Sequence, residues 1–230
     1  MCEELSHSGV VAKERLESAA CTTKGINSAM HTAMLHWDIP PVYNERMALF
    51  TGKGDKGVTG LFGCNQKMSK SSSIAEALGA LDECNSFLGL CKVIARRDSF
   101  SAENRSVADL IHDVQNHLFT VQAEMAGAEK RVPEASVKIM EALINAIEKE
   151  LPPIKSFLIS GATELSAWFD VARTLARRAE RRVVAVHDEG QRPIADHTRA
   201  YLNRLSSLLY ALARLANARA GITETPPEYK

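Results

Sequence analysis

The stretch "YLNRLSSLLYALARLAN", Tyr201 to Asn217, decides the fold class. Its leucines recur at intervals of three and four residues, which is the period of one face of an α-helix and not the alternation of a strand. The positions on this face are Leu202, Leu205, Leu209, Leu212 and Leu215. The pattern therefore predicts an amphipathic helix from about Asp196 to Ala220, with these leucines turned inward.

Four earlier segments show the same helical period. We expect helices over about residues 74–97, 102–128, 133–151 and 162–187. Val93 in the first and Ile139 in the third stand on the expected apolar stripes. Strand-like alternation never lasts beyond a few residues. Long helices with short connections predict an all-α fold, a five-helix up-and-down bundle that is ferritin-like in appearance.

Composition excludes several settings. The chain has 28 basic and 28 acidic residues, so its net charge gives no sign of nucleic acid, and we expect no such partner. No apolar run approaches the roughly eighteen residues of a membrane span, so we expect no membrane partner. The odd number of cysteines without a C-x-x-C pair favours a reduced, cytoplasmic location.

The periodicity also divides the chain. Residues 1–46 lack a sustained pattern and have neither the apolar core of a secretory signal nor the composition of a transit peptide. We expect them to form a loosely ordered N-terminal extension. Residues 47–220 form the helical-bundle domain, with Met47 as an alternative start, and residues 221–230 form a C-terminal tail.

A glycine-rich stretch, "FTGKGDKGVTGLFG" from Phe50 to Gly63, precedes the first helix. It is not a Walker loop, because Val58 stands where the lysine should be and no apolar strand comes before it. Glycines expose backbone N–H groups and permit positive φ, so the loop can form a concave nest for an anion. A flexible turn explains the same residues, and the loop alone does not decide between the two.

An arginine-rich run, "ARTLARRAERR" at 172–182, lies in the fourth helix. Arg173, Arg177, Glu180 and Arg181 fall within about a 100° arc of that helix. One interpretation is a solvated face with an Arg177–Glu180 pair. The other is a guanidinium cluster for polyphosphate, for which the planar fork of arginine is suited.

Two further polar patterns are weaker. The fifth helix carries a polar stripe whose members are Asn203, Ser206, Ser207, Tyr210 and Arg214. In the second helix, Asp113 with His117, and His112 nearby, suggest acid–base chemistry, although a histidine on a helix is more often simply solvated. Since no hydrolase or zincin motif occurs, the residues favour a bundle that binds polyphosphate and offers few acid–base groups.

Five motifs occur in a fixed order: "TGKGDKGVTGLFG", "SK" at Ser69-Lys70, "EALGALDECNSFLGL" at 76–90, "ARTLARRAERRVV" at 172–184, and "YLNRLSSLLYALARLAN". Together they closely resemble the ATP:cob(I)alamin adenosyltransferases of the trimeric helical-bundle (PduO) type, over about residues 49–217. The resemblance implies transfer of the 5′-deoxyadenosyl group of ATP to cob(I)alamin, with Mg²⁺, giving adenosylcobalamin and triphosphate. It also implies a homotrimer with sites between subunits, and transfer of the product to a cobalamin-dependent enzyme.

The resemblance assigns site residues by position. The ATP contacts it implies are Thr51, Gly52, Lys53, Gly54, Thr59, Gly60, Lys70, Arg177, Arg178, Glu180, Arg181 and Asn203. Of these, it implies a catalytic role for Arg177, Glu180 and Arg181. Phe157 corresponds to an aromatic residue on the lower face of the corrinoid, and Asp82 and Arg173 to a pair that bridges subunits. No residue is assigned as a metal ligand.

This sequence departs from the family pattern at two places. The family usually has T-[RK]-T-G-D in the loop, and Gly52-Lys53 replaces its middle residues, so a side chain is lost at Gly52. After Phe157, the usual P-G-G is replaced by Ile159-Ser160-Gly161. Two other functions stay open: a small-molecule kinase, which would yield ADP, and a bundle that binds ATP or a corrinoid without turnover.

Overall fold

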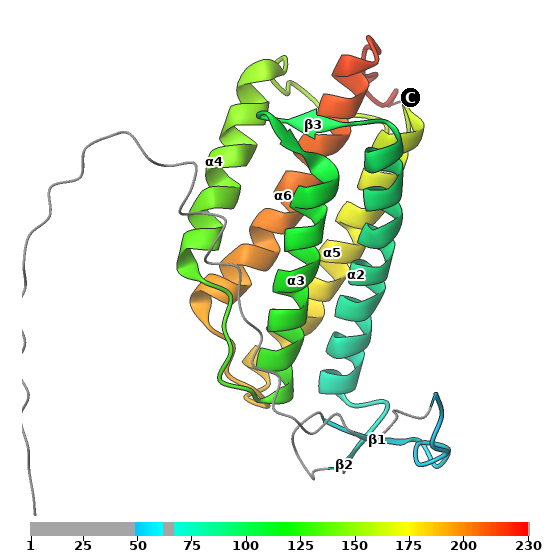
Figure 1. The fold of residues 1–230 in the computed structure, drawn as a ribbon, viewed down its shortest axis with the longest axis vertical. Coiled ribbons are helices and arrows are strands. Elements are labelled where there is room, and N and C mark those ends of the chain that lie inside the picture. Colours follow the sequence, from blue (N-terminus) through cyan, green and yellow to red (C-terminus); the bar gives the residue numbers. More distant parts are fainter. Residues whose placement is uncertain (1–48, 62–66, 230) are drawn as a thin grey trace, which may run out of the picture. The chain divides into compact units, whose positions relative to one another are not determined.

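The structure is a computed structural model that describes residues 49–61 and 67–229. The expected extension over residues 1–46 lies outside these ranges. The chain divides into two units, Met1–Phe50 and Thr51–Lys230. The second unit contains the long helices of the described chain, which are α2 Ser73–Arg97, α3 Val107–Ala126, α4 Glu134–Glu150, α5 Glu164–Asp188 and α6 Asp196–Arg219. Successive helices run in opposite directions (Figure 1), so the predicted all-α up-and-down bundle is confirmed.

The helices pack in an order that differs from their order in the chain. Helix α5 packs on α6 and α2, α2 also packs on α3, and α4 packs on α6. All five of the leucines predicted to face inward from α6 are buried. Because α6 lies between α5 and α4, its two sides both enter the core, and each fully buried leucine contributes about 1.5–3 kcal/mol to stability. Within the described residues, no helix is both long enough and apolar enough to cross a bilayer.

Two short hairpins accompany the helices. Strand β1 Val58–Gly60 pairs antiparallel with β2 Lys67–Ser69, and β3 Ser101–Ala102 pairs with β4 Arg105–Ser106. The second hairpin corrects the predicted helix over 102–128, which begins only at Val107. Glu103 and Asn104 take left-handed φ values of 48° and 59°. Two such residues in succession make the tight turn of a hairpin, and asparagine adopts this conformation readily.

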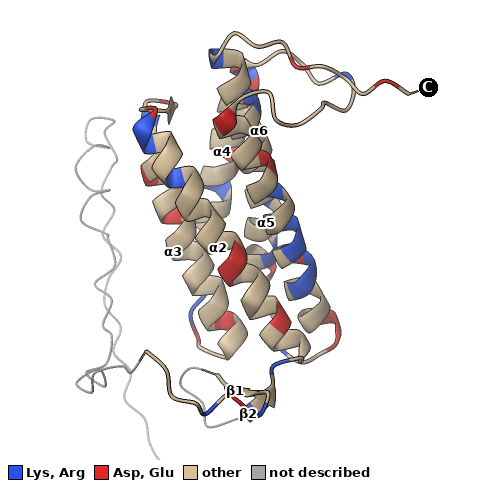
Figure 2. Ribbon diagram, turned by 90° about the vertical axis from the view of Figure 1, so that its right-hand side faces the viewer, with Lys and Arg blue, Asp and Glu red and all other residues tan. Residues whose placement is uncertain are grey.

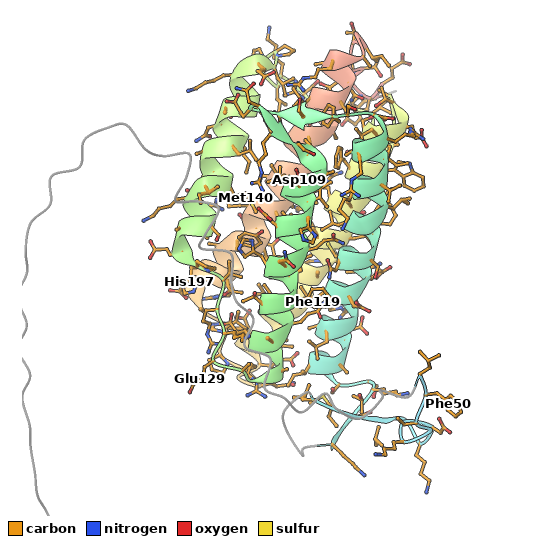
Figure 3. The ribbon with its side chains drawn as sticks, viewed as in Figure 1. Phe50, Asp109, Phe119, Glu129, Met140 and His197 are labelled. Atoms are coloured by element: carbon orange, nitrogen blue, oxygen red, sulfur yellow. The ribbon has the colours of Figure 1, made fainter. Side chains whose placement is uncertain are left out.

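Two predicted core positions are wrong. Val93 is 60% exposed and Ile139 is 52% exposed. Each lies one residue before the buried face of its helix, which passes through Ile94 in α2 and Met140 in α4. One residue turns a helix by about 100°, so these side chains point away from the core. Figure 3 labels Met140 together with Phe119, which is exposed on α3.

A buried carboxylate joins two helix ends. Glu124, near the end of α3, is 1% exposed. It accepts hydrogen bonds from the backbone N–H of Ala195 and the hydroxyl of Thr198, each at 2.7 Å, and pairs with Nε of Arg131 at 3.0 Å. Ala195 is the N-cap of α6 and has no side chain that can cap it. Glu124 therefore supplies from α3 the negative charge and acceptor that a helix N-terminus requires.

Candidate functional site

The register of α5 sets which of its residues face outward. Its start is fixed by a capping box, in which Thr163 Oγ1 accepts from the backbone N–H of Ser166 at 3.1 Å and Ser166 Oγ accepts from that of Thr163 at 2.9 Å. Alanines and larger apolar residues then recur on the buried face at intervals of three and four. The arginines consequently lie off that face, and Figure 2 shows the basic residues gathered along α5.

A cavity of about 290 Å³ lies where α5 meets α6. It is lined by Arg177, Glu180, Arg181 and Val184 from α5 and by Asn203 from α6. The amide of Asn203 donates to Oε1 of Glu180 at 2.8 Å, which holds the carboxylate against α6. The structure thus brings together four residues that the family resemblance assigned to ATP.

The two cavity arginines have no ion-pair partner within 4.0 Å among the described residues. Neither Arg177 nor Arg181 forms an ion pair with any residue in the described ranges, so the alternative Arg177–Glu180 surface pair is not formed. Two exposed guanidinium groups beside one carboxylate give the cavity a net positive charge. Guanidinium groups bind phosphate oxygens with charge-assisted hydrogen bonds, so the cavity suits a polyphosphate.

The neighbouring arginines of α5 face another helix. Arg178 pairs with Glu83 and Arg182 with Glu76 at 3.4 Å, both on α2. Arg178, which the resemblance assigned to ATP, does not line the cavity. Conversely, Val184 lines the cavity and was not predicted, although it lies seven residues after Arg177 and so on the same side of the helix.

The glycine-rich loop forms two consecutive turns that lead into the β1–β2 hairpin. The backbone N–H of Asp55 donates to Gly52 O at 3.2 Å, and that of Gly57 donates to Gly54 O at 3.1 Å. Gly52 and Gly57 have φ values of 66° and 75°, which a side chain would strain. A methyl group at Gly54 would lie 3.0 Å from Nζ of Lys70, so the lysine ammonium lies directly against the loop backbone.

Most of the predicted loop contacts are open to solvent. Thr51, Gly52, Lys53, Gly60 and Lys70 are exposed, and Gly54 and Thr59 are half-buried. None of these loop residues lines the cavity between α5 and α6. Within one chain, the loop and the arginine cavity are therefore two separate groups of phosphate-binding candidates.

The connection between α4 and α5 carries Phe157, which is 80% exposed. An aromatic ring this exposed contributes little to the core of its own chain. Phe157 does not line the α5–α6 cavity, nor a second cavity of about 400 Å³ that its neighbours Ser156 and Leu158 line. Phe157 is thus free to contact another molecule.

Asp82 and Arg173 do not meet within the chain. Asp82 is exposed on α2, and its carboxylate forms no ion pair or hydrogen bond with any other described residue. Arg173 lies 3.7 Å from Asp170 and stacks over the ring of Tyr210, with 5.8 Å between the guanidinium carbon and the ring centroid. Nε of Arg173 is buried without a hydrogen-bond partner.

His117, for which acid–base chemistry and a simply solvated side chain were the two interpretations, belongs to a half-buried hydrogen-bond network. One ring nitrogen of His117 shares a hydrogen bond with the hydroxyl of Tyr201 at 3.0 Å and the other with Ser136 at 3.2 Å. Burial lowers the pKa of His117, although the charge of Asp113 opposes this shift. Asp113 itself pairs with Arg105. In residues 49–61 and 67–229, no three acidic, histidine or cysteine side chains gather in a metal-binding group.

Comparisons with known proteins agree on one family. The family model described as cobalamin adenosyltransferase matches residues 49–216. A corrinoid adenosyltransferase of Bacillus subtilis is 37% identical over 186 residues, which are 79% of this chain and 93% of that protein. Corrinoid adenosyltransferase PduO of Citrobacter freundii is 38% identical over 175 residues, 73% of this chain and 49% of that longer protein.

A solved structure has the same fold. It is a variant of the PduO-type ATP:corrinoid adenosyltransferase of Lactobacillus reuteri, complexed with cobalamin and ATP. The two structures superpose with a TM-score of 0.69 at 27% sequence identity, over 79% of this chain and 100% of that one.

Proposed function

This chain belongs to the cobalamin adenosyltransferase family, and on that premise we propose that it transfers the 5′-deoxyadenosyl group of ATP to cob(I)alamin, forming adenosylcobalamin and triphosphate. It is a corrinoid adenosyltransferase by its relatives and by its fold. The observation that carries the proposal is the pair of unpaired guanidinium groups, Arg177 and Arg181, in one cavity.

The chemistry explains why the cavity has few acid–base groups. Cobalt(I) is itself the nucleophile, and it attacks the 5′ carbon of ATP while the bond to the triphosphate oxygen breaks. No proton moves in this step, so no base is required. The protein must hold the two reactants in line and stabilise the charge that grows on the triphosphate. Arg177 and Arg181 can stabilise this charge, and Glu180 with Asn203 can orient the nucleotide.

The ATP site that we propose combines the loop with the cavity. One part of ATP would contact the loop residues Thr51, Gly52, Lys53, Gly54, Thr59, Gly60 and Lys70. The other part would contact Arg177, Glu180 and Arg181 of α5, Asn203 of α6, and Arg178. The exposed backbone of the loop, with the Lys70 ammonium beside Gly54, supports an anion-binding role. Arg178 would need to leave Glu83 to take part.

One carboxylate, Glu180, lies beside the cavity arginines, which fits Mg²⁺ delivered with the triphosphate. In nucleotide sites this ion is usually held by one or two carboxylates together with phosphate oxygens. When bound, Mg²⁺ would neutralise part of the triphosphate charge. Chelating the metal with EDTA should then abolish turnover, and turnover that survives chelation would exclude this role.

We further propose a homotrimer with the site between neighbouring subunits. The separation of loop and cavity within one chain supports this, because a second copy can supply the missing half. Among the described residues, the Asp82 side chain has no partner, and Nε of Arg173 has Asp170 at 3.7 Å but no hydrogen bond, so an intersubunit pair would provide one for each. Leu90, Val93 and Val171 are exposed on the neighbouring helices α2 and α5, and a subunit contact would cover them.

Analysis of products distinguishes the proposed reaction from its alternatives. The protein is incubated with ATP, Mg²⁺ and chemically reduced cobalamin under anaerobic conditions. Adenosylcobalamin and triphosphate in equal amounts support the transferase. A kinase would release ADP, and a binding protein would release neither product.

A cytoplasmic location and delivery to a cobalamin-dependent enzyme stay predictions. Cell fractionation tests the first, and co-purification tests the second.

Phe157 provides a prediction on the corrinoid side. We expect Phe157→Ala to bind ATP as the unchanged protein does but to form adenosylcobalamin at least tenfold more slowly. The reason is that a ring on the lower face of the corrinoid keeps water and the lower axial base away from cobalt. ATP affinity is measured by calorimetry and turnover by absorbance. Since Phe157 is 80% exposed, the variant should fold normally, and an equal loss of ATP affinity would show a packing role instead.

A further inference from the structure

The C-terminal tail is attached to the helical bundle by a buried ion pair. Arg214, on α6, is 5% exposed and donates from Nε to Oε2 of Glu224 at 2.9 Å. Glu224 accepts a second hydrogen bond at 3.2 Å from the amide of Asn217. The backbone N–H of Ile222 donates to the carbonyl oxygen of Asn217 at 3.0 Å. The tail is therefore bound to α6 at Ile222 and at Glu224.

The same residues also reach the connection between α4 and α5. Arg214 donates from a terminal guanidinium nitrogen to the carbonyl oxygen of Pro152 at 2.9 Å, near the start of the connection. At its end, the Thr163 hydroxyl donates to Oδ1 of Asn217 at 3.4 Å. Between them, the backbone N–H of Ile159 donates to the carbonyl oxygen of Thr225 at 2.9 Å. Tail and connection run beside each other past the end of α6 (Figure 2).

A cavity separates much of the connection from the tail. The cavity of about 400 Å³ lies between them and is lined by Pro152, Ile154 and Leu158 of the connection and by Ile222 and Pro226 of the tail. The described connection has no helix or strand between Glu150 and Glu164. The polar bonds to Arg214, Asn217 and Thr225 therefore help to set its position, together with the hydrogen bonds of Ser160 and Gly161 to Asp170 of α5.

We propose that Arg214 and Glu224 are positioning residues for Phe157, and that residues 222–226 act as a strap that fixes the connection at the corrinoid side of the site. The ring of Phe157 lies two residues before the strap bond at Ile159. Because the ring is almost fully exposed, its own contacts do not fix it, and the strap does. The inference rests on the proposed function, since it assigns the strap to the corrinoid and not to ATP.

Removing the carboxylate tests the strap. Glu224→Ala leaves the buried guanidinium of Arg214 with Pro152 O as its remaining acceptor. We expect the KM for the corrinoid to rise about tenfold, the cost of one charge-assisted hydrogen bond, with the KM for ATP unchanged. Glu224→Gln keeps one of the two acceptor oxygens, which receive the bonds from Arg214 and Asn217. Its KM for the corrinoid should therefore lie between those of the unchanged protein and Glu224→Ala. Glu228→Ala is the matched control, because Glu228 is exposed in the same tail.

A second variant and a spectroscopic measurement separate positioning from general damage. A chain ending at Ala220 should reproduce the corrinoid defect of Glu224→Ala. In the shortened chain and in Glu224→Ala, a larger fraction of bound cob(II)alamin should keep its lower axial ligand than in the unchanged protein. Electron paramagnetic resonance measures this fraction, and Phe157→Ala should show the same increase. Equal changes in both KM values, or no change in either, would overturn the strap.

Hydrogen exchange keeps the inference testable if the proposed function fails. Without any substrate, the amides of residues 157–160 should exchange faster in Glu224→Ala than in the unchanged protein. If the unchanged protein shows no adenosyltransferase activity but these amides respond, the function is wrong and the strap is right. If the unchanged protein is active and the amides do not respond, the strap is wrong and the function is right.

Discussion

Arg177→Ala is expected to lower the rate of adenosyl transfer about a hundredfold or more while the protein stays folded and assembled. Arg177 lines the α5–α6 cavity and has no ion-pair partner among the described residues, so it is available to the triphosphate. Its guanidinium would strengthen its contact as charge accumulates on the leaving group. Loss of one such contact costs about 3 kcal/mol in the transition state.

The matched control for this variant is Arg182→Ala. Arg182 lies on the same helix and is also exposed, but it pairs with Glu76 of α2 and does not line the cavity. Single-turnover absorbance measurements compare the two variants at saturating ATP and corrinoid. We expect Arg182→Ala to react at nearly the unchanged rate. Near-normal turnover in Arg177→Ala would remove this residue from the proposed site.

Asp82→Ala and Arg173→Ala are each expected to weaken the trimer. If the two side chains meet in a largely buried subunit contact, removing one strands the other, which costs about 3–5 kcal/mol. The double variant should lose less stability than the sum of the two single losses, because no unpaired charge remains. Within its own chain, Arg173 keeps Asp170 at 3.7 Å, so part of its charge stays compensated. We therefore expect the loss of trimer stability to differ between Asp82→Ala and Arg173→Ala.

A double-mutant cycle measures this coupling. Trimer mass is determined by light scattering, and thermal unfolding is followed at one fixed protein concentration, since the stability of an oligomer depends on concentration. Arg97→Ala is the control, because Arg97 is exposed and pairs with Glu164 inside the same chain. Strictly additive losses would mean that Asp82 and Arg173 do not touch across subunits.

The sequence predicts the helices well because their signal is local. The leucines of α6 repeat with the helical period, and all five are buried. The start of α3 is missed because Glu103 and Asn104 take left-handed φ values, which the apolar period does not record. Val93 and Ile139 are misplaced because an apolar residue beside a buried face looks the same in sequence as one on it.

In the candidate site, too, the sequence predicts what depends on one helix and not what depends on packing between segments. Arg177, Glu180 and Arg181 share one helix, so their spacing alone predicts that they lie on a common side. The meeting of Glu180 with Asn203 depends on how α5 packs on α6, which spacing within one helix does not specify. Glu224 gave no signal at all, because its partner Arg214 is defined only once the tail folds back onto α6.

The carboxylate of Glu124 matters while the protein is still being synthesised. Translation proceeds from the N-terminus, so Glu124 leaves the ribosome well before Ala195 and Thr198, which follow 71 and 74 residues later. Until they emerge, α2 and α3 can bury this carboxylate only without those two donors, which is costly. Until then, of its described partners only Arg131 can pair with this carboxylate, so we expect Glu124 to stay near solvent in the nascent chain until α6 has been made. A ribosome-bound chain stalled before residue 195 should accordingly remain open to protease along α2 and α3, and one released after α6 should not.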